Sequence, residues 1–388
     1  MSEQLAYVII TPYTLYKSRT GGILARLISR TGLDLVGARM FAPSGELVQK
    51  YSSMIVSADD PQDRRIQELI RDYILQNLSP DAKTGRGRRV MVLLFKGEDA
   101  IRKIRSVIGN ISIERRGGET IRDTYGDLIV EDGNVRYFEP AVLAAPNVEE
   151  TKTKLKLWAA YSDKDGGMMD NTIAYGAGDA PQRTLVLIKP DNFRFPTGRP
   201  GNVIDFFSRT GLYIIGIKVH RMSVAEASEF YGPVRDILRT RLKDMVGGRA
   251  KALIEKEFGF KISPADEQKL AETLGPAYGD NQFENIVKFM SGRAPSETDP
   301  AQLKQPGSER CIAIIYEGVE AVRKIRDVLG PTDPSKAPPG SIRREFGQTV
   351  MVNAAHASDS PESAQREMKI VNVAENTFKQ VIEEFYGK

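Results

Sequence analysis

The feature that most constrains the fold of this chain is an internal repetition. Three segments of the first half recur, in the same order, in the second half. The pairs are residues 22–39 with 201–218, 97–109 with 318–330, and 120–122 with 341–343. The first pair shares the string S-R-T-G-L, in which glycine ends a helix before a strand begins. Three matches in one order predict a tandem duplication, in which both halves build the same fold.

The repetition divides the chain into a first copy at residues 1–158, a linker at 159–182 and a second copy at 183–388. The linker is rich in Gly, Asp and Ala and has no sustained periodicity. Within the second copy, apolar residues at helical spacing predict a helical insertion at 232–282. A packing elaboration is favoured for this insertion over a substrate lid, although long insertions can be functional.

Short apolar strands alternate with amphipathic helices in each copy. In the second copy we expect strands at 184–189, 212–219, 311–316 and 345–353, and helices at 203–209, 223–231 and 319–329. The order β-α-β-β-α-β, with extra helices, predicts an α/β fold of two ferredoxin-like α/β sandwich domains.

Composition excludes several classes of protein. The 55 Lys and Arg residues nearly balance the 51 Asp and Glu residues, so no nucleic-acid or membrane-surface partner is expected and any anion site must be local. The single cysteine, Cys311, excludes a disulfide framework and a cysteine-based zinc site, and it is expected in a buried strand. With no apolar run of membrane-spanning length, a cytoplasmic location is expected.

The chain has only two histidines, and one of them, His356, stands in the string N-A-A-H-A-S-D-S at 353–360. The run at 348–353 is predicted to be a strand, and Ser360 followed by Pro361 is typical of a helix start. His356 would then lie in a turn facing a helix N-terminus, whose unpaired N–H groups favour phosphate. The other histidine, His220, is predicted to be structural or on the surface.

Around this histidine the second copy resembles the nucleoside diphosphate kinase family over almost its whole length. The matching motifs are I-K-P-D at 188–191, F-x-x-I-V-K-F-M at 283–290, R-D-V-L-G-P-T-D-P at 326–334, P-G-S-I-R at 339–343 and N-A-A-H-A-S-D-S-P-E-S-A at 353–364. The resemblance implies transfer of the terminal phosphate of a nucleoside triphosphate to a nucleoside diphosphate, by a ping-pong route through phosphohistidine at His356. Imidazole suits this chemistry because it is largely uncharged near neutral pH. Mg²⁺ is expected on the nucleotide phosphates and water, since no protein carboxylate cage is predicted.

The resemblance also implies a role for each matching residue. His356 is the nucleophile; Lys189, Arg326, Arg343 and Thr332 hold phosphates; Tyr231 lies beside the histidine; Asn353 contacts the sugar; Ser358 and Glu367 support the site, with Glu367 accepting the second ring N–H; Phe283 and Val350 are the candidates for contacting the base. This sequence departs from the family where two adjacent aromatics are usual, because it has Gln282 before Phe283.

The first copy has lost the residues that transfer would need. Thr11 stands where the second copy has Lys189, and Pro146 is predicted at or near the position of the histidine. This copy should therefore be catalytically silent, although Arg105 and Arg122 remain. We expect it to replace one partner of a dimer within a single chain. A regulatory nucleotide site on the two arginines is the less favoured alternative.

Two functions from different classes follow for the whole chain. The favoured one is a nucleoside diphosphate kinase acting on nucleoside triphosphates and diphosphates. The alternative is a nucleotide-binding or phosphohistidine signalling scaffold with weak turnover, because the base platform is altered at Gln282. A higher homo-oligomer is left open.

Overall fold

The computed structural model describes residues 3–60, 62–111 and 117–387. Within it the chain forms two compact units. The first comprises residues 1–219 together with 312–388, and the second comprises His220–Cys311. Both sequence halves thus contribute to the first unit. Within the described ranges, no helix combines the length and the apolar character needed to cross a membrane.

The first half begins with a strand that is followed directly by a helix. The side chain of Thr11 caps this helix, α1, and Pro12 is its first residue. Its elements are β1 (Glu3–Ile10), α1 (Pro12–Tyr16), α2 (Thr20–Thr31), β2 (Asp34–Phe41), α3 (Gly45–Ser53), α4 (Arg64–Asn77), β3 (Val90–Glu98), α5 (Ala100–Ile108), α6 (Ile121–Tyr125), β4 (Asp127–Glu131), β5 (Asn134–Glu139), β6 (Val142–Leu143), α7 (Val148–Asp165) and β7 (Gly166–Gly167).

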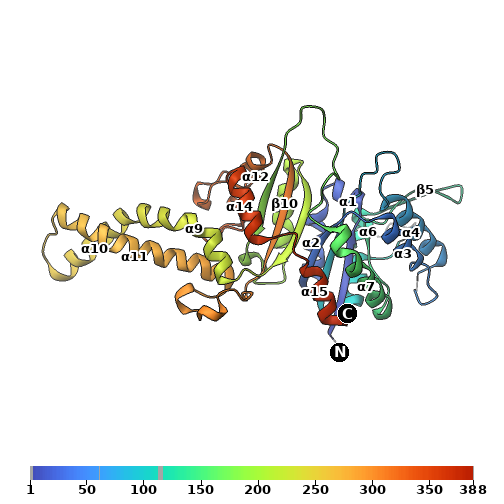
Figure 1. Ribbon diagram of the computed structural model, residues 1–388, viewed down its shortest axis with the longest axis horizontal. Coiled ribbons are helices and arrows are strands. Elements are labelled where there is room, and N and C mark those ends of the chain that lie inside the picture. The colour runs from blue at the N-terminus through green and yellow to red at the C-terminus, as the bar shows by residue number, and fades with distance from the viewer. Residues whose placement is uncertain (1–2, 61, 112–116, 388) are drawn as a thin grey trace. The chain divides into compact units, whose positions relative to one another are not determined.

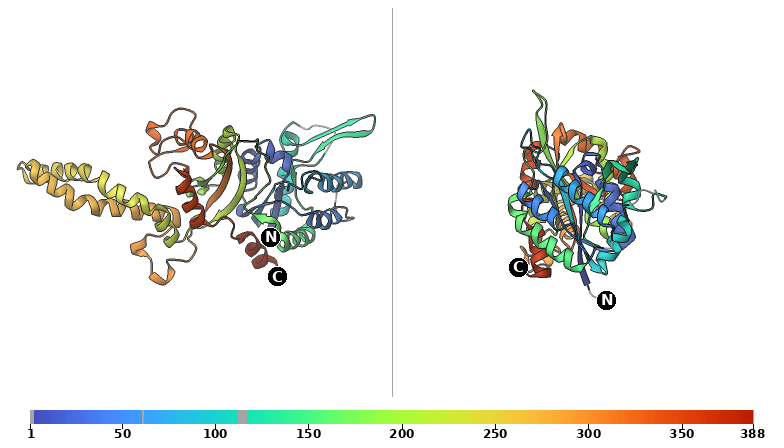
Figure 2. Two further views of the ribbon diagram at one scale, coloured as in Figure 1. Left: turned by 45° about the horizontal axis from the view of Figure 1, so that its top comes forward. Right: turned by 90° about the vertical axis from the view of Figure 1, so that its right-hand side faces the viewer.

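The strands of the first half form a sheet in the order β6-β1-β3-β2-β7, with antiparallel pairing at each contact. Alternate residues of β1 point to one face, where they pack with α3, α4 and α7 in the main hydrophobic core. Strands β4 and β5 pair only with each other, and Figure 2 shows this ribbon extending away from the sheet.

The second half supplies the remaining elements of the first unit. They are β8 (Pro181–Ile188), η1 (Pro190–Phe193), α8 (Arg199–Phe207), η2 (Ser208–Thr210), β9 (Tyr213–His220), β10 (Cys311–Val319), α12 (Ala321–Leu329), η5 (Pro334–Lys336), α13 (Ile342–Phe346), β11 (Ala355–Ala357), α14 (Pro361–Val371) and α15 (Thr377–Tyr386). Their sheet has the order β11-β8-β10-β9. This is the ferredoxin-like order, and it repeats β6-β1-β3-β2 of the first half strand for strand. The predicted α/β fold class is confirmed.

Helices α2 and α8 pack against each other and join the two halves within the first unit. Glycine makes the approach close, because a Cβ atom on Gly201 would lie 2.3 Å from both the Ala25 nitrogen and the Gly21 oxygen. A Cβ on Gly21 would lie 2.4 Å from the Asp205 nitrogen. The two backbones are therefore in direct contact, which any larger residue at either glycine would prevent.

The C-terminal helix α15 packs on the first half of the chain, beside α7 (Figure 1). The Phe378 ring meets the Phe41 ring edge-on at 5.5 Å, and Phe41 meets Trp158 at 4.9 Å. Asn376 caps the helix and also donates to Ser162 at 2.7 Å. The end of the chain is thus part of the core built mainly by its beginning.

The second unit is helical. It contains α9 (Val224–Arg241), α10 (Lys243–Phe258), α11 (Pro264–Ser291), η3 (Pro295–Glu297) and η4 (Pro300–Gln302), and α10 and α11 run side by side (Figure 2). Two glycines of α11 permit close packing on its neighbours, because a Cβ atom on Gly275 would fall 2.4 Å from Lys243 of α10 and one on Gly279 would fall 2.6 Å from Arg239 of α9. The segment 232–282 is largely helical, as its spacing predicted, but α9 begins before it and α11 ends after it. That this segment is an insertion with these boundaries remains a prediction.

The structure corrects two local predictions. The last strand is Ala355–Ala357, so the strand predicted at 345–353 is wrong: its first residues belong to α13, and the T-V-M-V run is a bend. Within that bend the N–H groups of Gln348 and Thr349 both donate to the Val352 oxygen, at 2.8 and 3.2 Å, and are not available to a sheet. The segment predicted as a linker begins as helix, because α7 continues to Asp165 with Ala159 and Ser162 on its buried face.

Candidate active site

The backbone around His356 is set by strand β11, the edge strand of the second sheet. Antiparallel pairing places His356 opposite Leu187 of β8. The preceding residue but one, Ala354, has a φ of 70°, and its N–H donates to the Asp191 carboxylate at 3.3 Å. His356 is therefore held within a strand and not in the turn that the sequence predicted, which restricts the directions its ring can take.

Helix α14 supplies the residue that orients the ring. Ser360 caps this helix by accepting from the Ser363 N–H, and Pro361 opens it, as the sequence predicted. Two turns along, Glu367 points back toward β11, and its Oε2 lies 2.8 Å from His356 Nε2. The Ser358 hydroxyl donates to the same Oε2 at 2.7 Å. The structure thus brings His356, Ser358 and Glu367 into one hydrogen-bonded group.

This arrangement selects one tautomer of the ring. An ionised carboxylate can only accept hydrogen bonds, so Glu367 Oε2 accepts both from the Ser358 hydroxyl and from a protonated Nε2 of His356. Nδ1 then keeps its lone pair and has the character of a nucleophile. The His356 side chain is 22% exposed, whereas Glu367 is 6% exposed, so the ring has an accessible edge and its carboxylate support is buried.

Lys189 is a buried cation at the end of β8 and beside β11. Its Nζ donates to the Met351 oxygen and, at 3.0 Å, to the Asn353 side-chain oxygen. Burial lowers the pKa of Lys189 to about 8, with Asp191 opposing and the positive charge of Arg343 reinforcing the shift. A bound anion would relieve both the desolvation and the repulsion.

Asn353 connects this lysine to the loop after α12. Its amide nitrogen donates to the Thr332 oxygen at 3.1 Å and to the Val350 oxygen at 2.7 Å, while its oxygen accepts from Lys189. The structure therefore brings Lys189, Asn353, Thr332 and Val350 together. The Val350 side chain is 59% exposed, as a residue that contacts a ligand from solvent would be.

Arg343, on α13, is buried directly behind the strand of His356. Its Nη1 donates to the Gly330 oxygen at 3.0 Å and its Nη2 to the Ala355 oxygen at 3.1 Å. The second bond places a guanidinium one residue from the histidine. Helix α13 is short, with Ser341 at its N-cap, and the two carbonyl contacts help to fix the position of the arginine.

Arg326 lies farther out, on the exposed side of α12. With Asp359 and Pro361 it lines an open cavity of about 430 Å³ at the start of α14. A hydrogen bond with Ser363 lowers the pKa of Asp359, burial opposes this, and the charge of Arg326 lowers it further. Arg326 thus acts electrostatically on the loop between His356 and α14.

Tyr231 and Phe283 belong to the second unit. The Tyr231 ring packs against Phe230 at 4.9 Å, and Phe283 is 7% exposed with the Arg235 guanidinium 5.6 Å from its centroid. Their contacts with the histidine and with a base therefore remain predictions. His220 is also in this unit; it is buried, with its Nε2 3.5 Å from the Glu226 carboxylate.

Asp191 and Asn192 are two members of the site that the sequence reasoning did not assign. Asp191 accepts from Arg199 at 3.0 Å, and the Asn192 amide donates to the Lys189 and Ala354 oxygens at 2.9 and 2.7 Å. These bonds fix the backbone from Lys189 to Asn192, which follows β8, against Ala354. Asp191 is the last residue of the I-K-P-D motif, so this motif was the feature of the sequence that could have identified it.

The first half shows which residue replaces the histidine. Strand β6 pairs with β1 so that Leu143 is opposite Ile9, as His356 is opposite Leu187. A hydrogen bond agrees with this register: Arg122 Nη2 donates to the Val142 oxygen at 3.2 Å, one residue before Leu143, as Arg343 Nη2 donates to the Ala355 oxygen, one residue before His356. The prediction of Pro146 was therefore wrong by three residues: the position holds a buried leucine. Thr11 does match Lys189. The Thr11 N–H donates to the oxygen of Ala141, directly before β6, and the Lys189 N–H donates to the oxygen of Ala354, directly before β11.

The carboxylate that orients the ring is also replaced. Asn147 caps α7 as Ser360 caps α14, and the residue seven positions after the cap is Lys154 in the first half and Glu367 in the second. Lys154 is buried and pairs with Glu150 at 2.5 Å. The sequence comparison missed this reversal of charge, because the two helices share no letters that would align them.

No group of three or more His, Cys, Asp or Glu side chains in the described part of the chain is placed to hold a metal ion.

Comparison with known proteins identifies relatives of the half that contains this site. The model of the family described as nucleoside diphosphate kinase matches residues 258–376, which include His356, Arg326, Arg343 and Glu367. The nucleoside diphosphate kinase of Staphylothermus marinus is 31% identical over 190 residues, which are 49% of this chain and 92% of that protein. That of Streptomyces coelicolor is 36% identical over 128 residues, or 32% and 82% of the two chains.

Solved structures give a similar coverage. An NDP kinase from Pyrobaculum aerophilum is 27% identical, with 49% of this chain and 95% of that chain covered and a TM-score of 0.34. The resemblance predicted from the motifs is confirmed by the sequence relatives. The family model's match does not extend into the N-terminal half.

Proposed function

Because the chain belongs to the nucleoside diphosphate kinase family, we propose that this enzyme transfers the terminal phosphate of a nucleoside triphosphate to a nucleoside diphosphate through phosphohistidine at His356. The observation that carries the proposal is the hydrogen-bonded group formed by His356, Glu367 and Ser358, in which the buried carboxylate orients the ring through Nε2.

In the first half-reaction, Nδ1 of His356 attacks the terminal phosphorus. A nitrogen–phosphorus bond forms, the bond from that phosphorus to the bridging oxygen breaks, and the nucleoside diphosphate leaves. The ring becomes cationic, and the buried carboxylate of Glu367 stabilises it through Nε2. In the second half-reaction a terminal oxygen of another nucleoside diphosphate takes the phosphoryl group, and neutral His356 is regenerated.

The phosphate chain would be held by the cations around β11. Phosphoryl transfer spreads charge over the equatorial oxygens, so positioning and positive charge supply most of the catalysis. Lys189 and Arg343 are buried close to the strand, and Arg326 lies at the mouth of the open cavity. Thr332 is exposed and available to the phosphates. Mg²⁺ would arrive on the nucleotide and neutralise part of its charge.

The nucleoside would contact residues further from the histidine. Asn353 is proposed to bind the sugar, which requires its oxygen to be shared with or released by Lys189. Val350 is proposed for one face of the base because it is exposed beside Asn353. From the second unit, Phe283 is proposed for the other contact with the base, and Tyr231 is proposed to lie beside His356.

We further propose that the chain arose by duplication and that its first half serves as an intrachain dimer partner. The repeated strand order and the direct backbone contact of α2 with α8 support this proposal. Leu143 and Lys154 in place of the histidine and glutamate support catalytic silence of the first half, since neither can form or orient a phosphohistidine. The single cysteine supports the proposed cytoplasmic location.

Labelling tests the phosphohistidine directly. Incubation with ATP labelled at the terminal phosphate should give an acid-labile, base-stable phosphoprotein that GDP discharges. His356→Ala should abolish both the label and the exchange, and His220→Gln, the matched variant at the only other histidine, should retain them. Wild-type turnover by His356→Ala would refute the mechanism. Stable labelling with negligible exchange would favour a phosphohistidine scaffold.

A further inference from the structure

A second cluster of cations lies in the first half, around a cavity that the proposed reaction does not use. The cavity measures about 30 Å³, and its walls include Arg105 of α5, Arg122 of α6, Lys154 of α7 and Leu143 of β6, with Asp60 and Gln62 from the loop before α4. These side chains come from five segments that are distant in sequence and meet in one place.

The position of this cavity in the fold matches that of the histidine site. Arg105 and Arg122 occupy the helix positions of Arg326 and Arg343, and Arg122 bonds the Gly109 and Val142 oxygens as Arg343 bonds Gly330 and Ala355. Leu143 replaces the histidine, so the nucleophile is absent. Phosphate-positioning cations have nevertheless been kept.

Lys154 changes the charge of the cavity. In the second half the corresponding residue is the anionic Glu367, which serves an imidazole. Once the imidazole is replaced by leucine, a carboxylate there would repel an anion, and the first half has a lysine at this place. The two substitutions together remove transfer chemistry and add positive charge, which is the combination that binding without transfer requires.

The cations of the cavity are only partly neutralised by protein groups. Lys154 pairs with Glu150 at 2.5 Å, but Arg105 and Asp60 are 3.9 Å apart, longer than a hydrogen bond. The Arg122 Nε atom is buried and has no hydrogen-bond partner among the residues that the structure describes. Burial, and then the charge of Arg105, lower the pKa of Arg122 to about 10, while Asp60 opposes this shift.

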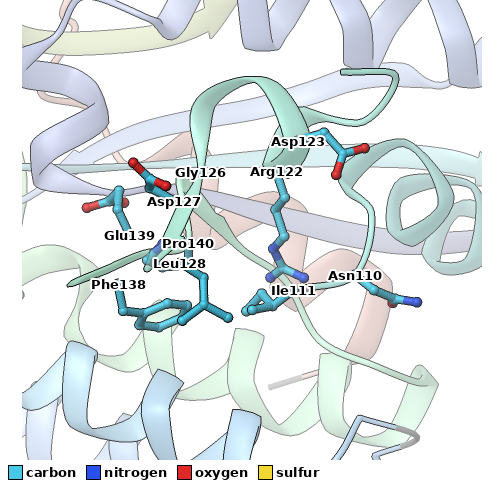
Figure 3. A pocket seen from close by; sticks show the side chains of 10 residues that line it. All are labelled: Asn110, Ile111, Arg122, Asp123, Gly126, Asp127, Leu128, Phe138, Glu139 and Pro140. Carbon is cyan, nitrogen blue, oxygen red and sulfur yellow. The ribbon is translucent and has the colours of Figure 1, made fainter. Parts of the chain in front are cut away.

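Arg122 also borders a second small cavity, which has the opposite character. Its walls include the acidic residues Asp123, Asp127 and Glu139 together with Leu128 and Phe138. Figure 3 shows Arg122 beside Ile111 on one side of this cavity, with Asp127 and Glu139 on the other. Among the described residues, three carboxylates face one arginine in this cavity and would repel a phosphate, whereas the Lys154 cavity has three cations against the single carboxylate of Asp60 and is the one suited to an anion.

We propose that the cavity formed by Arg105, Arg122 and Lys154 binds one phosphate group without transferring it. A cavity of about 30 Å³ accepts on the order of two waters or one small anion, and it has no room for a nucleoside. The ligand is therefore inorganic phosphate or the terminal phosphate of a molecule whose remainder stays outside. Binding there would tie α5, α6 and α7 together and stabilise the first half.

Equilibrium dialysis of the full chain with labelled inorganic phosphate, at constant ionic strength, tests the site. Arg105→Gln should remove one equivalent of bound phosphate per chain, or raise its dissociation constant at least about tenfold, because a charge-assisted contact is lost. Arg102→Gln is the matched control: it lies on the same helix with its side chain 75% exposed, outside the cavity. Nucleotide exchange should be unchanged in both variants.

Lys154→Met provides a second variant that leaves α5 untouched and should also lower phosphate binding. Equal binding by wild type, Arg105→Gln and Lys154→Met would overturn the proposal, as would wild-type phosphate binding that Arg326→Gln abolishes completely. The source of the phosphate is read from competition in the Arg326→Gln background. If a non-hydrolysable ATP analogue displaces the labelled phosphate, the natural ligand is a nucleotide phosphate. If the analogue does not displace it, the ligand is free phosphate. In both cases the bound phosphate must be lost when Arg105 is replaced by glutamine.

Discussion

Replacing Glu367 by glutamine tests whether the carboxylate works on the histidine ring. The change preserves size and a hydrogen-bond acceptor 2.8 Å from Nε2 but removes the negative charge. A hydrogen bond to a charged group is worth about 1.5–3 kcal/mol, and each 1.4 kcal/mol is about a factor of ten in rate. Because the His356 side chain is 22% exposed, we expect the lower part of this range, a loss of kcat of about 10- to 30-fold.

Steady-state exchange between ATP and a second nucleoside diphosphate measures the effect. KM should change little, because Glu367 is buried behind the ring and does not reach the substrate. Glu362→Gln is the matched control, since Glu362 is exposed in the first turn of the same helix. Ser358→Ala should cost about 2- to 10-fold alone and less in the Glu367→Gln background, because the serine acts through the carboxylate. Wild-type kcat in Glu367→Gln, with unchanged folding, would refute the reasoning.

Three further outcomes are expected. The free energy of unfolding of the wild type relative to Lys189→Met should rise by about 3 kcal/mol between pH 7 and pH 10.5. The reason is that the folded pKa of Lys189 is about 8 against an ordinary value of 10.5, so the unfolded chain binds the extra proton over this range. Denaturant titrations at several pH values measure this difference, and a pH-independent difference would contradict the prediction. Gly201→Ala should destabilise the chain by about 1–3 kcal/mol or more through backbone overlap with α2, whereas Gly45→Ala, which meets open space, should not, and thermal unfolding compares the two. Phe378→Ala should cost about 3–5 kcal/mol by opening a cavity beside Phe41 and Trp158, which calorimetry would detect; a loss below about 1 kcal/mol would show that α15 is not part of the core.

Local signals predicted much of the second half correctly. The Ser360–Pro361 start of α14 was predictable because a cap is made by neighbouring residues, and the apolar strands were predictable because burial imposes its period on the sequence. The 348–353 run failed for a related reason: its β-branched residues favour a strand, but hydrogen bonds to Val352 within the loop satisfy its backbone first.

The equivalence of Leu143 with His356 lay beyond the sequence. Letter matching placed Pro146 there, because A-A-P-N and A-A-H-A look alike, whereas strand pairing with β1 sets the true register. Lys154 was missed because its relation to Glu367 is a matter of helix caps and not of shared residues.

The sequence by itself determined the order of the motifs and the type of most elements predicted in the second half, because propensity, capping and burial period are properties of residues close together in the chain. Only the tertiary structure decided which distant side chains meet: that Glu367 reaches His356, that Lys154 joins Arg105 and Arg122, and that Phe378 completes the core of the first half. These contacts depend on strand register and helix packing, which arise from the shape of the whole folded chain and leave no mark in any single stretch of it.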